Sequence, residues 1–262
     1  MKYVNLISLS LLLGLLMSCG RYEAGDTISE PPAVELSKQL LEGLKAGENV
    51  DSILQQLANL EPQALKAELN TREEQLAFWV NIYNGMVQHL LITQPELWEK
   101  RNSFFSTDRI TVAGKLMSPE LIEHGIIRGG EAKLGLGLVP KFFTNKFERS
   151  FKIKGGDPRV HFALNCGAID CPPIEIYDPK NLNERLDYRS RVYLEKHTVI
   201  DEAEEEFTTT PLVSWFRGDF ATYGGVNDFF VHFGILSEQQ QGFSRSHKDY
   251  DWTLATGVYA ED

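Results

Sequence analysis

The sequence predicts an α+β fold, in which several helices pack on a small mixed or antiparallel sheet within a single domain. Three observations support this prediction. The composition, 42% hydrophobic and 24% charged, is that of an ordinary globular chain and excludes disordered and collagen-like proteins. Long segments of helical periodicity are interspersed with short strand patterns. These elements follow no regular strand–helix–strand order, which is typical of an α+β domain.

The N-terminus has the pattern of an export signal. Lys2 supplies a positive charge, and Val4 to Met17 form an apolar run that is shorter than the roughly 20 residues needed to span a bilayer. The run ends in Leu16-Met17-Ser18-Cys19, which resembles the lipobox of bacterial lipoproteins. Residues 1–18 are therefore predicted to be a lipoprotein signal peptide.

Cys19 is the predicted site of lipidation, with a palmitate-type acyl chain as membrane anchor. Residues 19–32 contain two glycines and end in Pro31-Pro32, a composition typical of a flexible tether. We expect the protein to lie in the bacterial cell envelope, anchored at the periplasmic face or the outer surface, with the membrane as its partner through this anchor.

Two helical segments begin the folded part. Leucines at helical spacing predict helices over Val34 to Ala46 and Val50 to Leu60, which form an N-terminal helical hairpin within residues 33–70. The Thr71-x-x-Glu74 pattern is a capping box that opens a long, largely apolar helix ending near Ile92.

Residues 71–262 are predicted to form the main α+β domain, which makes one globular unit with the hairpin. Five shorter elements are expected after the long helix. In order, they are a hairpin from Arg109 to Lys115, a helix from Ser118-Pro119 to Ile127, a strand from Arg159 to Asn165, a helix from Asn181 to His197, and a hairpin of Thr198–Ile200 with Phe207–Thr210.

Four separated motifs carry a family resemblance. They are Ala77-Phe-Trp-Val-Asn81-Ile-Tyr83-Asn84, Ile122-Glu123-His124-Gly-Ile-Ile-Arg128, His161-Phe-Ala-Leu-Asn165-Cys166-Gly-Ala-Ile-Asp170-Cys171-Pro-Pro and Tyr250-Asp251-Trp252. Over residues 70–254 the chain resembles the domain of unknown function family 547. The resemblance implies a fold family that is found in bacterial envelope proteins and in eukaryotes, without a settled activity.

Cys166 and Cys171 admit three interpretations. An exported protein meets an oxidising compartment, and the two cysteines that remain beside the lipidated Cys19 form an even pair, so a disulfide is the first. Two inert buried thiols are the second. In the third, Cys166 is a nucleophile that attacks an amide or ester carbonyl, since the thiol is the most easily ionised of the common nucleophiles.

The catalytic interpretation also needs a base. A strand from Arg159 to Asn165 would place Cys166 about 16 Å from His161 along the chain, so His124 is the better base and His161 the weaker candidate. An asparagine that orients the histidine would complete a papain-like set of Cys, His and Asn. On this analogy the fold has a papain- or transglutaminase-like core, whose central helix carries Asn81 in place of a cysteine.

A polar cluster is the second candidate site, and its members are Asn81, Asn84, Glu123, Arg128 and Asn165. Buried amides on the long apolar helix either hold neighbouring segments in place or line a cleft. The arginine follows His124 by one helical turn, and this row of side chains suits an anionic small molecule. The cluster therefore leaves a structural and an anion-binding interpretation open.

Several function classes lack support in the sequence. The net charge of −11, from 26 basic and 37 acidic residues, argues against nucleic acid as a partner. The Cys-x4-Cys spacing with one upstream histidine is a poor zinc pattern, so no metal is expected. No phosphate-binding loop and no dinucleotide motif is present, so no cofactor is expected.

The preferred hypothesis is an envelope lipoprotein whose domain is a binding or scaffolding module, with an envelope protein or a small molecule as unidentified partner. The first alternative is a cysteine-type hydrolase or transferase that acts on an amide or ester bond. The second is a protein that binds an anionic small molecule. Convergence of the four motifs on one concavity would favour a functional role for them, whereas scattering through the core would indicate a folding role.

Overall fold

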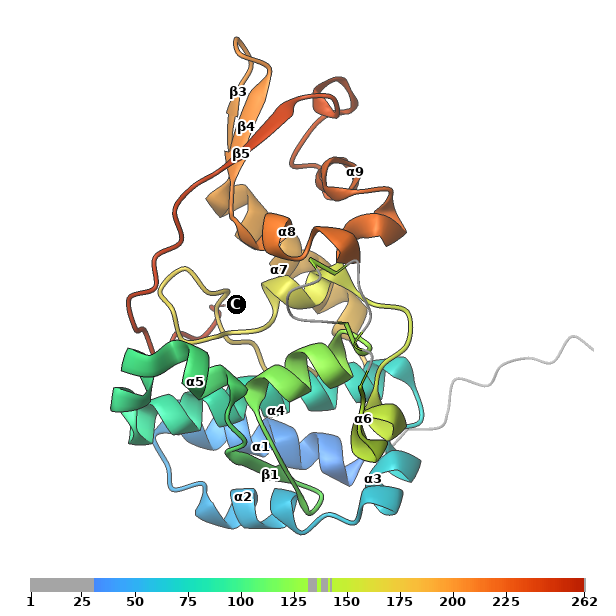
Figure 1. The fold of residues 1–262 in the computed structure, drawn as a ribbon, viewed down its shortest axis with the longest axis vertical. Helices are drawn as coiled ribbons and strands as arrows, with labels where there is room; N and C mark the ends of the chain where they lie inside the picture. Colours follow the sequence, from blue (N-terminus) through green and yellow to red (C-terminus); the bar gives the residue numbers. More distant parts are fainter. Residues whose placement is uncertain (1–30, 132–135, 138–140, 142, 262) are drawn as a thin grey trace, which may run out of the picture.

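The computed structural model describes residues 31–131, 136–137, 141 and 143–261. The predicted signal peptide, Cys19 and residues 19–30 of the tether lie outside these ranges. Helices make up most of the described chain, and two small sheets of two and three strands complete it (Figure 1). The prediction of a single α+β domain is confirmed. None of the described helices is long and apolar enough to cross a membrane.

Helix α4 (Arg72–Thr93) is the central element of the helical layer. The Thr71 hydroxyl accepts from the Glu74 backbone N–H at 3.1 Å, and the Glu74 carboxylate accepts from the Thr71 N–H at 2.7 Å, so the predicted capping box is present. Every residue from Leu76 to Gln88 is buried. Because so little of its circumference faces solvent, α4 is a core helix on which the other elements pack.

The N-terminal part contains one more helix than predicted. Helix α1 (Pro32–Ala46) packs along α4, and α2 (Asp51–Ala58) returns beside α1, as expected of a helical hairpin. Helix α3 (Pro62–Glu68) then begins with a proline in its first turn, where a missing N–H costs nothing. Gly85 of α4 lets α1 approach closely, since a Cβ there would lie 2.6 Å from Leu40 Cδ2.

Short elements connect α4 to the rest of the domain. They are η1 (Pro95–Lys100), α5 (Arg101–Ser106), β1 (Ile110–Val112) and β2 (Lys115–Met117). Strands β1 and β2 pair antiparallel with Thr111 opposite Leu116, which confirms the predicted hairpin.

The predicted helix after Ser118-Pro119 has an unusual winding. Residues Leu121–Ile127 form a π-helix, η2, in which the Arg128 N–H donates to the Glu123 carbonyl at 2.9 Å, five residues back. Such wide turns are rare and concentrate at functional sites. Helix α6 (Lys146–Phe151) follows and packs against η2.

The C-terminal half forms a second layer (Figure 1). Helix α7 (Leu182–His197) leads into β3 (Val199–Asp201), which pairs antiparallel with β4 (Glu206–Thr209), whereas β5 (Ser244–His247) pairs parallel with β4. The larger sheet is therefore mixed. Four short helices lie between β4 and β5: α8 (Leu212–Trp215), η5 (Arg217–Tyr223), α9 (Val226–His232) and η6 (Glu238–Gln240). Apolar side chains of α8, η5 and α9 pack with others from α7 and β4 in a second hydrophobic cluster, beside the one around α4.

The prediction of a strand from Arg159 to Asn165 is wrong. Residues Pro158–Phe162 form a 3-10 helix, η4, because the Asp157 carboxylate accepts from the Arg159 N–H at 3.1 Å and Pro158 presets the first turn. The apolar side chains that suggested a strand are buried all round, and a buried run of this length does not distinguish strand from helix. The expected 16 Å separation of His161 and Cys166 therefore does not apply.

Three amides on one face of α4 hold the irregular segments in place. Asn81 bonds both backbone groups of Tyr177, with its Nδ2 2.9 Å from the carbonyl and its Oδ1 2.9 Å from the N–H. Asn84 donates to the Ala163 carbonyl at 2.9 Å and accepts from the Asn165 N–H at 2.8 Å. Gln88 accepts from the Gly257 N–H at 2.9 Å, so this row joins the helix to three distant parts of the chain.

The Asn84→Leu variant is expected to be clearly destabilised. It leaves the Ala163 carbonyl and the Asn165 N–H buried without partners, at about 1–3 kcal/mol for each group. Urea unfolding should therefore show a free energy of unfolding lower by at least about 2 kcal/mol. Gln39→Leu is the matched control, because this amide is exposed and, among the described residues, bonds only the Glu35 side chain at 3.1 Å. Equal losses in the two variants would contradict the structural role of Asn84.

Candidate functional site

The four sequence motifs meet at one pocket of about 200 Å³. Tyr83 comes from α4, Glu123 and His124 from η2, His161 from η4, and Tyr250 and Trp252 from the C-terminal segment. The full lining is Tyr83, Asn102, Phe105, Glu120, Glu123, His124, His161, Leu164, Cys166, Cys171, Pro172, Leu212, Trp215, Phe216, Tyr250 and Trp252. Segments that are far apart in sequence thus build a single concavity with aromatic walls and a polar end.

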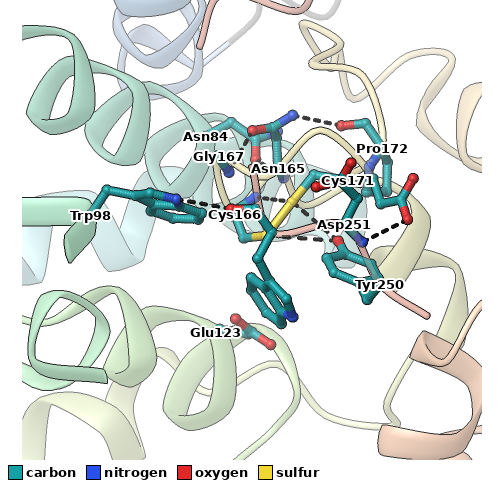
Figure 2. Close-up of a disulfide and its surroundings, with 12 residues drawn as sticks. Asn84, Trp98, Glu123, Asn165, Cys166, Gly167, Cys171, Pro172, Tyr250 and Asp251 are labelled. Atoms are coloured by element: carbon teal, nitrogen blue, oxygen red, sulfur yellow. Dashed lines mark hydrogen bonds between the residues drawn. A yellow bond between two sulfur atoms is a disulfide. The ribbon is translucent and has the colours of Figure 1, made fainter. Parts of the chain in front are cut away.

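A disulfide between Cys166 and Cys171 forms part of the pocket wall (Figure 2). The Tyr250 hydroxyl donates to Cys171 Sγ at 3.3 Å, and the Asn165 side chain donates to the Pro172 carbonyl at 2.8 Å. Neither sulfur can be a thiolate in this state. The expectation that Cys166 acts as a nucleophile is therefore corrected for the oxidised protein.

The loop closed by the disulfide also holds the Tyr250-Asp251-Trp252 motif in place. The Ile169 N–H donates to the Thr253 carbonyl at 2.8 Å, and the Ala255 N–H donates to the Gly167 carbonyl at 2.8 Å. The Trp98 indole N–H donates to the Trp252 carbonyl at 3.0 Å. Trp252 also stacks on Trp215, with ring centroids 5.8 Å apart. Backbone pairing and ring packing together hold this wall of the pocket.

A buried ion pair lies behind the polar end of the pocket. Arg128 Nε and Nη2 donate to the two oxygens of Asp219 at 2.7 and 2.8 Å. The His161 Nε2 lies 2.7 Å from Asp219 Oδ2. Burial opposes ionisation of Asp219, but the hydrogen bonds from His161 and Arg128 outweigh it and hold the pKa of this carboxyl far below its usual value.

The pKa values of both pocket histidines are lowered from the usual histidine value, which favours the neutral rings at neutral pH. Burial lowers the pKa of His161, although Asp219 acts in the opposite direction. Burial also lowers the pKa of His124, although the Glu123 charge acts in the opposite direction, and the Arg128 charge adds to the lowering. The His124 Nδ1 lies 2.7 Å from Arg128 Nη1, and the His161 ring stacks on Phe216 at 4.0 Å between centroids. Arg128 and Asp219, which bond the two rings, do not line the pocket, whereas Phe216 does.

Glu123 and Tyr83 form the remaining polar part of the pocket. The Tyr83 hydroxyl donates to Glu123 Oε2 at 3.1 Å. Burial raises the pKa of Tyr83 well above its usual value, and the nearby Glu123 charge raises it further. Tyr83 is therefore a neutral donor that orients a carboxylate, and it is not a proton source at neutral pH.

The structure divides the predicted site residues into two groups. Cys166, His124, His161 and Glu123 line the pocket. The amides Asn81, Asn84 and Asn165 and the guanidinium of Arg128 do not, which favours the structural one of the two interpretations that the sequence left open for this cluster. The amides bond backbone groups or one another, and the Arg128 side chain, 1% exposed, is neutralised by Asp219. Cys19 lies outside the described residues.

Sequence reasoning missed Asp219. This residue lies in an aromatic segment outside the four motifs, and no spacing links it to Arg128 or His161, which are 91 and 58 residues away. Trp215 and Phe216, two further wall residues, come from the same segment. An acidic residue among aromatic ones was the sole signal, and it does not specify a partner.

A comparison with protein families supports the resemblance of the motifs. Residues 67–194 match the family described as “Protein of unknown function, DUF547”. The chain carries a DUF547 domain. Three of the four motifs fall within this domain, and the Tyr250–Trp252 motif lies beyond it. No curated protein and no solved structure matches the chain, so the papain- or transglutaminase-like core stays a prediction.

The disulfide predicts a simple result in peptide mapping. Trypsin should release residues 160–180, which contain both cysteines, as one peptide. From protein purified without reductant and treated with iodoacetamide, this peptide should carry no label and should lack two hydrogen atoms relative to its reduced form. Reduction before alkylation should add two labels and serves as the control. A singly or doubly labelled peptide without reduction would show free thiols and contradict the pairing.

Proposed function

We propose that the protein is a lipid-anchored envelope protein whose DUF547 domain binds a small molecule in the pocket where the four motifs meet. The observation that supports this proposal is the convergence of the four motifs on one cavity. Residues needed only for folding would not have to meet at a concave surface. A small pocket with aromatic walls and a few polar groups at one end is also the usual form of a ligand site.

The geometry supports the enzymatic alternative and the anion-binding alternative less well. A cysteine-type hydrolase or transferase needs a free thiolate, and Cys166 is in a disulfide. An anionic ligand needs an available cation, and Arg128 is buried and paired in bidentate fashion with Asp219. Glu123 adds a negative charge to the same pocket. A neutral ligand fits this set of groups better.

The membrane anchor is tested by replacing Cys19. Cells grown with an alkyne-tagged palmitate should label the wild-type protein, which should sediment with the membranes. Cys19→Ser should lose both the label and the membrane association, because the acyl chain is the expected anchor. Cys166→Ser is the control and should remain labelled. Membrane association of Cys19→Ser would contradict the lipoprotein proposal.

Pocket binding is tested with neutral aromatic compounds of benzene and indole size, detected by ligand-observed NMR. Several of them should bind the wild-type protein. Leu212→Trp, which fills the cavity from its wall, should abolish their binding while the far-UV CD spectrum is retained. Leu116→Trp is the matched control, because Leu116 is exposed on β2 and does not line the pocket. Absence of binding to the wild type, or equal binding to both variants, would contradict the proposal.

A further inference from the structure

The hydrogen bonds behind the pocket determine which nitrogen of His124 carries the proton. Arginine has N–H donors and no acceptor, so the Arg128 Nη1, 2.7 Å away, requires a lone pair on His124 Nδ1. A neutral imidazole with a lone pair on Nδ1 carries its proton on Nε2. No described residue accepts a hydrogen bond from this Nε2. His124 therefore presents an N–H donor to the pocket that it lines.

The same reasoning assigns His161 the opposite role. The Asp219 carboxylate is an acceptor only, so the His161 Nε2, 2.7 Å from its Oδ2, must carry the proton. The lone pair of the neutral ring is then on Nδ1, which bonds to none of the described residues. Both rings carry the proton on Nε2, but His124 is held through its Nδ1 and His161 through its Nε2. His161 consequently presents an acceptor to the same pocket.

Glu123 supplies a second acceptor beside the two rings. Its Oε2 accepts from the Tyr83 hydroxyl at 3.1 Å, and its Oε1 lies 3.9 Å from His124 Nδ1, beyond hydrogen-bond distance. A carboxylate can accept about four hydrogen bonds, so it retains capacity for a ligand. These three side chains thus offer one donor, on His124, and two acceptors, on His161 and Glu123, at the polar end of the pocket, which Glu120 also lines.

We propose that this polar end recognises a primary carboxamide, in a ligand whose body packs against the aromatic walls. The proposal rests on the function proposed above and specifies the ligand's chemistry. The carboxamide oxygen would accept from His124 Nε2–H, and its two N–H groups would donate to His161 Nδ1 and Glu123. A carboxylate offers no donor and would face the Glu123 charge. An ammonium offers no acceptor for His124, and a hydroxyl has a single proton for two acceptors.

Three neutral probes of one size test this complementarity. Benzamide offers the acceptor and both donors, acetophenone replaces the NH2 by a methyl group, and benzyl alcohol offers a single O–H. Dissociation constants measured by NMR titration should be about tenfold lower for benzamide than for either of the other probes, a ratio that corresponds to ~1.4 kcal/mol. Equal affinities for the three would overturn the carboxamide assignment and leave pocket binding intact. Failure of all three to bind would contradict pocket binding itself.

Two variants of His124 separate recognition from packing. In His124→Gln, the side-chain carbonyl can accept from Arg128 while its NH2 faces the pocket, so the dissociation constant for benzamide should stay close to that of the wild type. His124→Leu lacks the donor and should weaken the binding of benzamide and acetophenone alike, by about tenfold, because both present a carbonyl oxygen to His124. An unchanged affinity in His124→Leu, or equally weakened binding in both variants with the fold intact, would overturn the role of the His124 donor.

The tautomers can also be measured in the wild-type protein, without any variant. In an ¹⁵N-labelled sample at neutral pH, long-range ¹⁵N–¹H spectra should show the proton on Nε2 and a lone pair on Nδ1 for both His124 and His161. Addition of benzamide should shift His161 Nδ1 as it accepts a hydrogen bond. A proton on Nδ1 of either histidine would remove the donor–acceptor pair and overturn the proposal.

Discussion

The row of amides on α4 is the constraint on which the rest of the structure depends. The helix itself follows from its capping box and its apolar circumference. Part of the pocket wall, in contrast, comes from segments without regular hydrogen-bonded structure, such as residues 164–172, and these need partners for their buried backbone groups. Asn81, Asn84 and Gln88 provide them for Tyr177, for Ala163 with Asn165, and for Gly257. Rigid helix and irregular pocket wall are thereby joined.

A second constraint is electrostatic. Burying the Arg128 guanidinium would be costly without a counter-charge, and Asp219 supplies one from a segment 91 residues away. The ion pair brings η5 to the back of η2 and η4, and its remaining hydrogen bonds reach both pocket histidines. One buried pair therefore closes the domain around the pocket and also determines the protonation pattern of His124 and His161. Stability and the proposed recognition therefore depend on the same four side chains.

Much of the fold could be predicted because its signals are local. The capping box at Thr71 and the alternating residues of the β1–β2 and β3–β4 hairpins depend on near neighbours, and the structure confirms all three. The prediction of a strand at Pro158 to Phe162 was wrong because the apolar residues there fit both a strand and a helical turn. Their burial on all sides removed the alternation of buried and exposed residues that distinguishes a strand from a helix. The π-helical winding of η2 was not predicted, because the cap and proline at Ser118-Pro119 indicate where a helix begins and do not specify how it winds.

The sequence by itself determined the α+β class, the elements with strong local signals, the family resemblance, and four motifs that contain His124, His161, Glu123 and Cys166. It could not determine that these motifs meet, since their meeting depends on contacts over tens to hundreds of residues. Only the tertiary structure decided that Asn81, Asn84 and Arg128 support the pocket from behind. It also assigned Asp219 as the partner that orients His161. Donor and acceptor roles of the histidines follow from such contacts, and a linear sequence does not contain distances.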